Sequence, residues 1–208
     1  MKLIIDAFAD GAQIPAKFAF GRIPPEGRFA LSDNVNPALA WDNVPVGTKS
    51  LALLCHDPDV PSSGEDVNQE GRSVPPGLAR VDFYHWVVAN IPTTTTAIPE
   101  GAESSGVTAK GKPVGARAYG LVGQNDYTGW FAGDPEMGGT YGGYDGPCPP
   151  WNDSIIHHYH FTLFALDVET LPLSGAFTGA DLRAAMDGHI LAQAVHTGTY
   201  SMNRDLAV

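Results

Sequence analysis

Cysteines, basic residues and long apolar runs are all scarce in this chain of 208 residues. Its two cysteines, Cys55 and Cys148, cannot form the disulfide framework of a small secreted protein. Lysines and arginines number 12 against 23 aspartates and glutamates, so the formal net charge is −11. The chain therefore lacks the basic footprint of a nucleic-acid-binding protein, and it has little attraction to an anionic membrane surface.

Targeting and membrane-spanning signals are also missing from the sequence. No segment approaches the 18 or so consecutive apolar residues that span a bilayer. The apolar run at residues 3–5 stops at Asp6, and no small-residue cleavage site follows it. The sequence thus predicts a soluble, reduced, cytoplasmic protein with no membrane insertion, in which the Asn152-Asp-Ser154 sequon has no meaning.

Glycine and proline are abundant. The 24 glycines and 17 prolines together make 41 residues, about a fifth of the chain, against a usual share of about 12%. Hydrophobic residues make up 43%, which is enough for a substantial core. This composition predicts many turns and short strands, and we expect one domain over residues 1–208.

Apolar, β-branched and aromatic runs predict a mainly β chain with one late helix. We expect strands at residues 3–8, 17–20, 51–56, 83–91, 155–167 and 198–200, and a helix at about 180–195, capped by Thr178 or Asp181. The strand at 155–167 reads as buried on both faces. Residues 62–80 form a polar excursion, and the Gly- and aromatic-rich segment 121–146 reads as ordered.

Titratable side chains gather at the ends of three predicted strands. Asp57 and Asp59 follow the first of these strands, His85 lies near the start of the second, and His157 begins the third. Strand alternation places Tyr159 on the same face as His157. A carboxylate beside an imidazole raises its pKa, and backbone N–H groups of a Gly loop add donors. If the three strands are neighbours, these groups form a pocket for one phosphoryl or carboxyl group.

Two separate motifs stand out: Asp57-Pro-Asp-Val-Pro61 with His85 in Tyr-His-Trp-Val-Val, and Gly146-Pro-Cys-Pro-Pro150 followed by His157-His-Tyr159. Together they resemble the phosphatidylethanolamine-binding protein family, in particular its bacterial and archaeal Raf-kinase-inhibitor-like branch. The resemblance covers residues 33–200. It implies an all-β fold, an antiparallel Greek-key β-sandwich with a C-terminal helix and long ordered loops.

The resemblance also implies a small anion pocket, and in this chain the matching residues are Asp57, Asp59, Pro61, His85, Gly146, Pro147, His157 and Tyr159. By the same resemblance, we expect a cis peptide bond in the Pro-rich loops. The family's second motif usually reads Gly-x-His-Arg, but His158 stands in place of the arginine here. That departure removes a permanent charge near the motif.

Two other site classes compete with an anion pocket. Histidines and aspartates supply ligands for a metal ion, but His157 and His158 face opposite sides of a strand and no familiar metal-binding spacing is present. A His/Asp pair could act as a general base in a small hydrolase, although no Gly-x-Ser-x-Gly elbow occurs. Cys148, between prolines, reads as a semi-buried loop residue rather than a reactive thiol.

We therefore expect a binding or regulatory module without a cofactor, whose ligand is a small anionic or phosphorylated molecule. His85 and His157 would donate to the anion, and Asp57 and Asp59 would orient them. Tyr159 and the Gly146 backbone would complete the site, with Pro61, Pro147 and Trp86 as walls. The segments 62–80 and 121–146 are expected to shape the pocket rim or form a homodimer contact. The alternative is a small hydrolase using the same residues.

Overall fold

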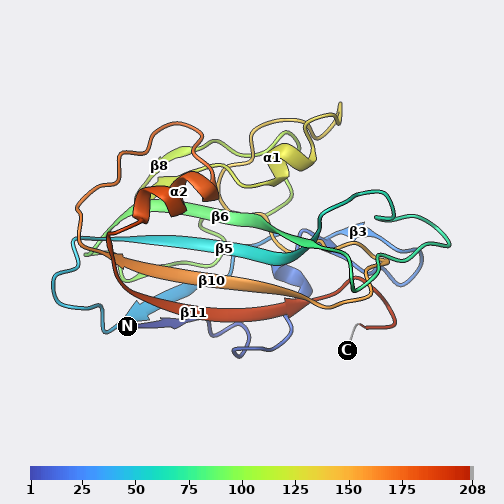
Figure 1. Cartoon of the computed structure of the whole chain (residues 1–208), viewed down its shortest axis with the longest axis horizontal. Coiled ribbons are helices and arrows are strands. Elements are labelled where there is room, and N and C mark those ends of the chain that lie inside the picture. Colours follow the sequence, from blue (N-terminus) through green and yellow to red (C-terminus); the bar gives the residue numbers. More distant parts are fainter. Residues whose placement is uncertain (207–208) are drawn as a thin grey trace.

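The computed structural model describes residues 1–206, which form mainly antiparallel strands (Figure 1). The strands are β1 (Lys2–Ile4), β2 (Gly21–Arg22), β3 (Ala30–Leu31), β4 (Leu39–Asp42), β5 (Ser50–Pro61), β6 (Arg80–Pro92), β7 (Ala97–Ile98), β8 (Gly115–Arg117), β9 (Gly120–Val122), β10 (His157–Leu166) and β11 (Ile190–Tyr200). The helices are the 3₁₀ turn η1 (Ala16–Phe18), α1 (Tyr127–Trp130) and α2 (Gly179–Met186).

A six-stranded sheet dominates the molecule, in the order β11-β10-β5-β6-β9-β8. Within it, β10 returns by a long connection to lie beside β5, and the order β10-β5-β6-β9 is that of a Greek key. A second sheet, β1-β4-β7, faces it, and β2 and β3 form a separate hairpin. The predicted mainly β, antiparallel sandwich with a late helix is confirmed.

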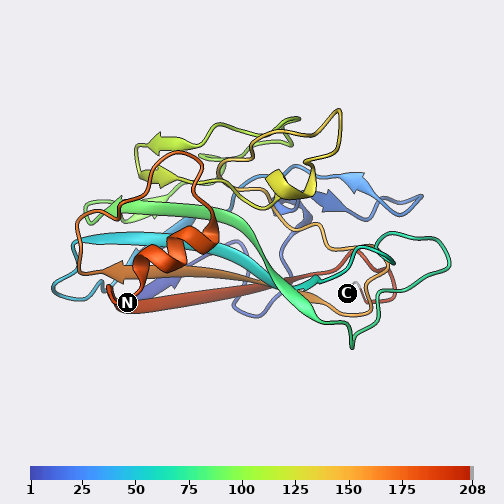
Figure 2. The same ribbon diagram turned by 45° about the horizontal axis from the view of Figure 1, so that its top comes forward.

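Both faces of the central sheet are buried, and β10 shows why. Its alternate residues Tyr159, Phe161 and Leu163 join the larger core between the two sheets. Phe164 and Leu166 belong to a second core, under α2. Figure 2 shows α2 lying across the outer face of the six-stranded sheet. The prediction of a strand buried on both faces is therefore confirmed.

The predicted helix over 180–195 is wrong in its second half. Helix α2 ends at Met186, and Gly188 adopts a left-handed φ of 78° that carries the chain into β11. Residues 190–200 then pair with β10 along its whole length, so the predicted three-residue strand at 198–200 has 11 residues. Pairing with a neighbouring strand outweighed the helical spacing of Ile190, which is exposed. Thr178 does cap α2, in a capping box with Asp181.

Other local expectations also need correction. The segment 17–20 is not a strand, because Phe18 and Ala19 donate their N–H groups to Pro15 and Ala16 in the 3₁₀ turn. Strand β5 does not stop at residue 57 but continues to Pro61, with register shifts that accommodate its prolines. No cis peptide bond occurs in residues 1–206.

The long segment 121–146 is ordered, as predicted. Asn125 donates its N–H to the Tyr141 carbonyl at 2.7 Å, and Gly142 donates to the Lys112 carbonyl at 2.8 Å. Phe20, Tyr127 and Tyr141 form a small core of their own beneath it. Within residues 1–206, no helix is both long and apolar enough to cross a membrane.

Candidate functional site

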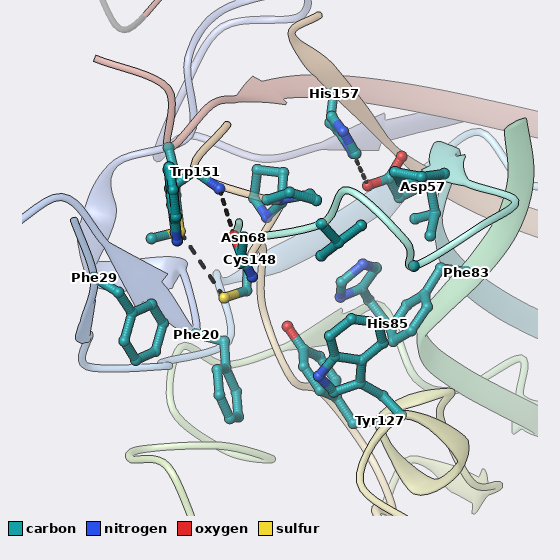
Figure 3. Close-up of a pocket in the computed structure, with 18 of the residues that line it drawn as sticks. Phe20, Phe29, Asp57, Asn68, Phe83, His85, Tyr127, Cys148, Trp151 and His157 are labelled. Carbon is teal, nitrogen blue, oxygen red and sulfur yellow. Dashed lines mark hydrogen bonds and ion pairs between the residues drawn. The ribbon is translucent and has the colours of Figure 1, made fainter. Parts of the chain in front are cut away.

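A cavity of about 280 Å³ opens at the end of the central sheet where β5, β6 and β10 meet the loops (Figure 3). Seven aromatic rings outside the sequence motifs line it: Phe20, Phe29, Phe83, Tyr127, Trp130, Phe131 and Trp151. Its polar side chains are Asp57, Asn68, His85, His157 and Tyr159. The cavity is thus a small, largely apolar chamber with a few polar groups at one side.

A β-bulge brings His85 into this chamber. Cys55 pairs with Trp86 while the next residue, His56, pairs with Tyr84, so His85 is an extra residue on β6. Such a bulge re-aims a side chain. Tyr84 joins the core under α2, whereas His85 lines the cavity. Its Nδ1 lies 2.8 Å from the carbonyl oxygen of Asp145.

His157 stands between two carboxylates. Its Nδ1 lies 2.7 Å from Asp57 Oδ2, and its Nε2 lies 3.1 Å from Asp153 Oδ2. Arg80 completes the group by a two-point contact with Asp153, with N···O distances of 2.6 and 3.0 Å. Two carboxylates therefore face one guanidinium and one imidazole, and all four side chains are buried or nearly so.

The charge state of His157 follows from these contacts. Burial alone would lower its pKa, but the hydrogen bonds and the charges of Asp153 and Asp57 raise the pKa to about 9. At neutral pH the ring is an imidazolium that donates both of its protons to the carboxylates. The four-residue network then carries no net charge.

Tyr159 contributes a buried hydroxyl. Its ring lies edge-on to that of His85 at 5.1 Å, and its Oη lies near the Asp57 carboxylate without completing a hydrogen bond of good geometry within residues 1–206. Burial, with the negative charge of Asp57, raises its pKa well above the ordinary value. Tyr159 therefore keeps its proton, which the hydroxyl can donate in a hydrogen bond.

Five of the eight predicted site residues line this cavity. They are Asp57, Pro61, His85, His157 and Tyr159. The roles differ from the expected ones, however. Both nitrogens of His157 are occupied by carboxylates, so it has no proton to donate to an anion. Of the five, Tyr159 can donate a proton to a ligand, and His85 can do so only when both of its ring nitrogens are protonated.

The other three predicted residues lie behind the wall. Asp59 accepts hydrogen bonds from the N–H and Nδ1 of His158, so it orients that half-exposed histidine and not His85 or His157. The Gly146 N–H is taken by the Asn34 side chain, and a Cβ at Gly146 would lie 2.0 Å from the Phe18 carbonyl oxygen. Gly146 is therefore a packing glycine and not a ligand donor.

Pro147 and Trp86, both predicted as walls, serve the fold instead. The Pro147 carbonyl accepts the N–H groups of Phe20 and Gly21, and this anchors the loop that precedes β2. Trp86 is fully buried in the main core and does not line the cavity. The two extra segments do reach this cavity, since Asn68 of 62–80 and Phe131 of 121–146 line it.

Sequence reasoning missed Asp153 and Arg80. Asp153 is the middle residue of the Asn152-Asp-Ser154 sequon, and its loop position offers no periodicity that would link it to His157 four residues later. Arg80 begins β6, but its contact with Asp153 spans 73 residues. The one signal in the sequence is that 12 lysines and arginines must serve 23 aspartates and glutamates, so each arginine is a candidate partner for a buried carboxylate.

Known proteins resemble this chain along nearly its whole length. A family model described as phosphatidylethanolamine-binding protein matches residues 4–201. YbhB of Escherichia coli K12 is 33% identical, with 97% of this chain and all of YbhB aligned. A Chlamydia pneumoniae protein is 34% identical, with 96% of this chain and 98% of that protein aligned.

Two solved structures agree with these matches. E. coli YbcL, titled a new member of the mammalian PEBP family, superposes with a TM-score of 0.67 at 26% identity, covering 96% of this chain and 97% of YbcL. CT736 of Chlamydia trachomatis, titled a homologue of phosphatidylethanolamine-binding protein, gives a TM-score of 0.64 at 29% identity over 96% of each chain. This chain belongs to the phosphatidylethanolamine-binding protein family.

Proposed function

We propose that this protein is a binding module that takes a small anionic group, of the phosphoryl type, into the cavity beside His85. The observation that carries the proposal is the unengaged Tyr159 hydroxyl, which lies beside His85 in a buried chamber next to a charge-balanced network. Buried polar atoms without partners are rare in proteins, and one that lines a cavity indicates a ligand position.

The charge-balanced network makes an anion tolerable in an acidic protein. Asp57 would by itself repel an anion, but the His157 imidazolium and Arg80 offset the charges of Asp57 and Asp153. The remaining walls are largely apolar and include seven aromatic rings, so they favour a ligand whose charged group carries a compact organic part. A volume of about 280 Å³ lies near the low end for ligand pockets, so we expect a small ligand.

Thermal unfolding in an anion-poor buffer tests the proposal, with phosphoethanolamine as the probe. Ligand at ten times Kd stabilises a one-site protein by roughly 1.4 kcal/mol, which for a chain of this length raises Tm by roughly 3–6 °C. Tyr159→Phe keeps the ring but removes the hydroxyl, and we expect it to lose most of this rise. His189→Ala, which changes a half-exposed histidine paired with Asp167, is the matched control and should keep the rise.

Absence of any rise in wild type, with phosphoethanolamine or inorganic phosphate, would refute the proposal. An equal rise in wild type and Tyr159→Phe would place the anion elsewhere. Release of phosphate during incubation, lost in His85→Ala, would show the hydrolase instead of the module.

A further inference from the structure

The hydrogen bond at His85 Nδ1 determines what its other nitrogen can do. The partner, 2.8 Å away, is the carbonyl oxygen of Asp145, which can only accept, so Nδ1 carries a proton. A neutral imidazole has one N–H, and Nε2 of His85 is then an acceptor. Nε2 makes no hydrogen bond within residues 1–206, and the ring lies in the cavity wall between the Asp57–His157 pair and Tyr127 (Figure 3).

The other polar groups at this side of the cavity offer few protons. Asp57 is a carboxylate that accepts from Asp59 N and His157 Nδ1. His157 gives both protons to carboxylates. Arg80 directs its terminal nitrogens to Asp153 and to backbone carbonyls, and it does not line the cavity. Beside His85 a ligand therefore meets two acceptors and one hydroxyl, while the Asn68 amide lies nearer Trp151 in the cavity wall.

A fully deprotonated oxyanion fits these side chains poorly, because its oxygens would face the His85 Nε2 lone pair and the Asp57 carboxylate. An acid that retains one proton fits well. Its P–OH donates to His85 Nε2, and one of its charged oxygens accepts from the Tyr159 hydroxyl. The deprotonated ligand leaves the His85 Nε2 acceptor unpaired, and the free-energy cost of that unpaired acceptor favours the ligand that keeps a proton.

We propose that the cavity selects oxyacids that keep an ionisable proton when bound, such as phosphate monoesters, phosphonates and inorganic phosphate, over sulfate, sulfonates and phosphodiesters. This inference rests on the proposed anion-binding function and deepens it. An intact phospholipid headgroup is a diester without such a proton, so we expect it to bind poorly. The matching ligand is a free phosphomonoester.

His85 is neutral because burial outweighs the carboxylates that face it. The facing groups are Asp57 on β5, His157 and Tyr159 on β10, Asp145 in the loop before β10, and Tyr127 on α1. Burial lowers the pKa of His85, and the charge of Asp57 and the Asp145 carbonyl offset only part of that effect. A ligand without a proton can bind only if His85 takes up a proton from solvent. Above the pKa of His85, the affinity of the cavity for such a ligand should therefore fall tenfold for each pH unit.

Two matched ligand pairs test the proposal on the full chain by titration calorimetry at pH 6.5. Methylphosphonate and methanesulfonate have similar shapes and both carry one negative charge there, but only the phosphonate keeps a proton. Phosphoethanolamine and glycerophosphoethanolamine contrast a monoester, of which about a quarter still holds its second proton at pH 6.5, with a diester that holds none. We expect the proton-bearing member of each pair to bind at least tenfold more tightly.

The variant His85→Gln provides a second readout, because an amide can turn either its oxygen or its NH₂ toward the ligand. We expect the preference for methylphosphonate over methanesulfonate to shrink to about threefold or less, while Thr178→Ala, remote from the cavity, keeps it. Equal affinities within both wild-type pairs would overturn the inference and leave anion binding intact. Binding of none of the four ligands, nor of inorganic phosphate, would overturn the proposed function as well.

Discussion

The buried imidazolium of His157 should make the stability of the protein depend on pH in a way that can be calculated. The folded-state pKa of His157 is raised from 6.5 to about 9. A raised pKa means that the folded state holds a proton that the unfolded chain releases more easily. Its contribution to stability is therefore fully present below pH 6.5 and is lost as the pH rises through about 9.

The magnitude follows from the same two values. One pKa unit corresponds to about 1.4 kcal/mol, so the bound proton contributes roughly 3 kcal/mol at low pH, and about 2 kcal/mol of this is lost between pH 6.5 and 8.5. Urea denaturation followed by tryptophan fluorescence should detect the change. With a slope of about 2 kcal/mol per molar urea, the midpoint of unfolding should fall by about 1 M over that interval.

Two asparagine variants separate this effect from other titrations. His157→Asn removes the imidazole between Asp57 and Asp153, and its midpoint should change little with pH. His158→Asn removes the neighbouring histidine, which is half exposed and bonded to Asp59, and it should keep the full dependence. If the midpoint of wild type falls no more than that of His157→Asn, the assignment of a buried imidazolium is refuted.

Two further substitutions test the surroundings of the site. Arg80→Met leaves the buried Asp153 carboxylate without its guanidinium, so urea unfolding should show a loss of roughly 3–5 kcal/mol; a loss below about 1 kcal/mol would mean that the pair is not needed. Gly146→Ala places a methyl group 2.0 Å from the Phe18 carbonyl oxygen and should cost roughly 1–3 kcal/mol. Gly64→Ala, where nothing lies within 4 Å, should be nearly neutral, and equal losses in the two alanine variants would refute the packing role of Gly146.

Alternation along strands explains why part of the site could be predicted from the sequence. A period of two placed His157 and Tyr159 on one face, and the structure shows both in the cavity wall. The same rule fails for His85. Simple alternation would separate His85 from Trp86, but the bulge after Cys55 turns both toward the interior between the sheets. The position of a bulge depends on the partner strand, so local sequence does not reveal it.

Chain segments that meet only in the folded molecule account for what was missed. The aromatic wall combines Phe20 near η1, Phe29 before β3, Tyr127 on α1 and Trp151 in the Pro-rich loop. Each of these residues looks like an ordinary core side chain in its own segment. Helix α2 shows the related difficulty at the secondary-structure level, since a helical pattern that continued to Ile190 was overridden by pairing with β10.

The two motif histidines, His85 and His157, have different hydrogen-bond partners and therefore different protonation states. His157 is bonded to two carboxylates, which holds it charged and joins β5, β10 and the loop at Asp153 into one frame. His85 is bonded to a carbonyl, which leaves one nitrogen for a ligand. Replacing buried charges by apolar residues often costs no stability, so the network is better explained by positioning than by stability alone. It fixes the Asp57 carboxylate in the cavity wall that His85 also lines.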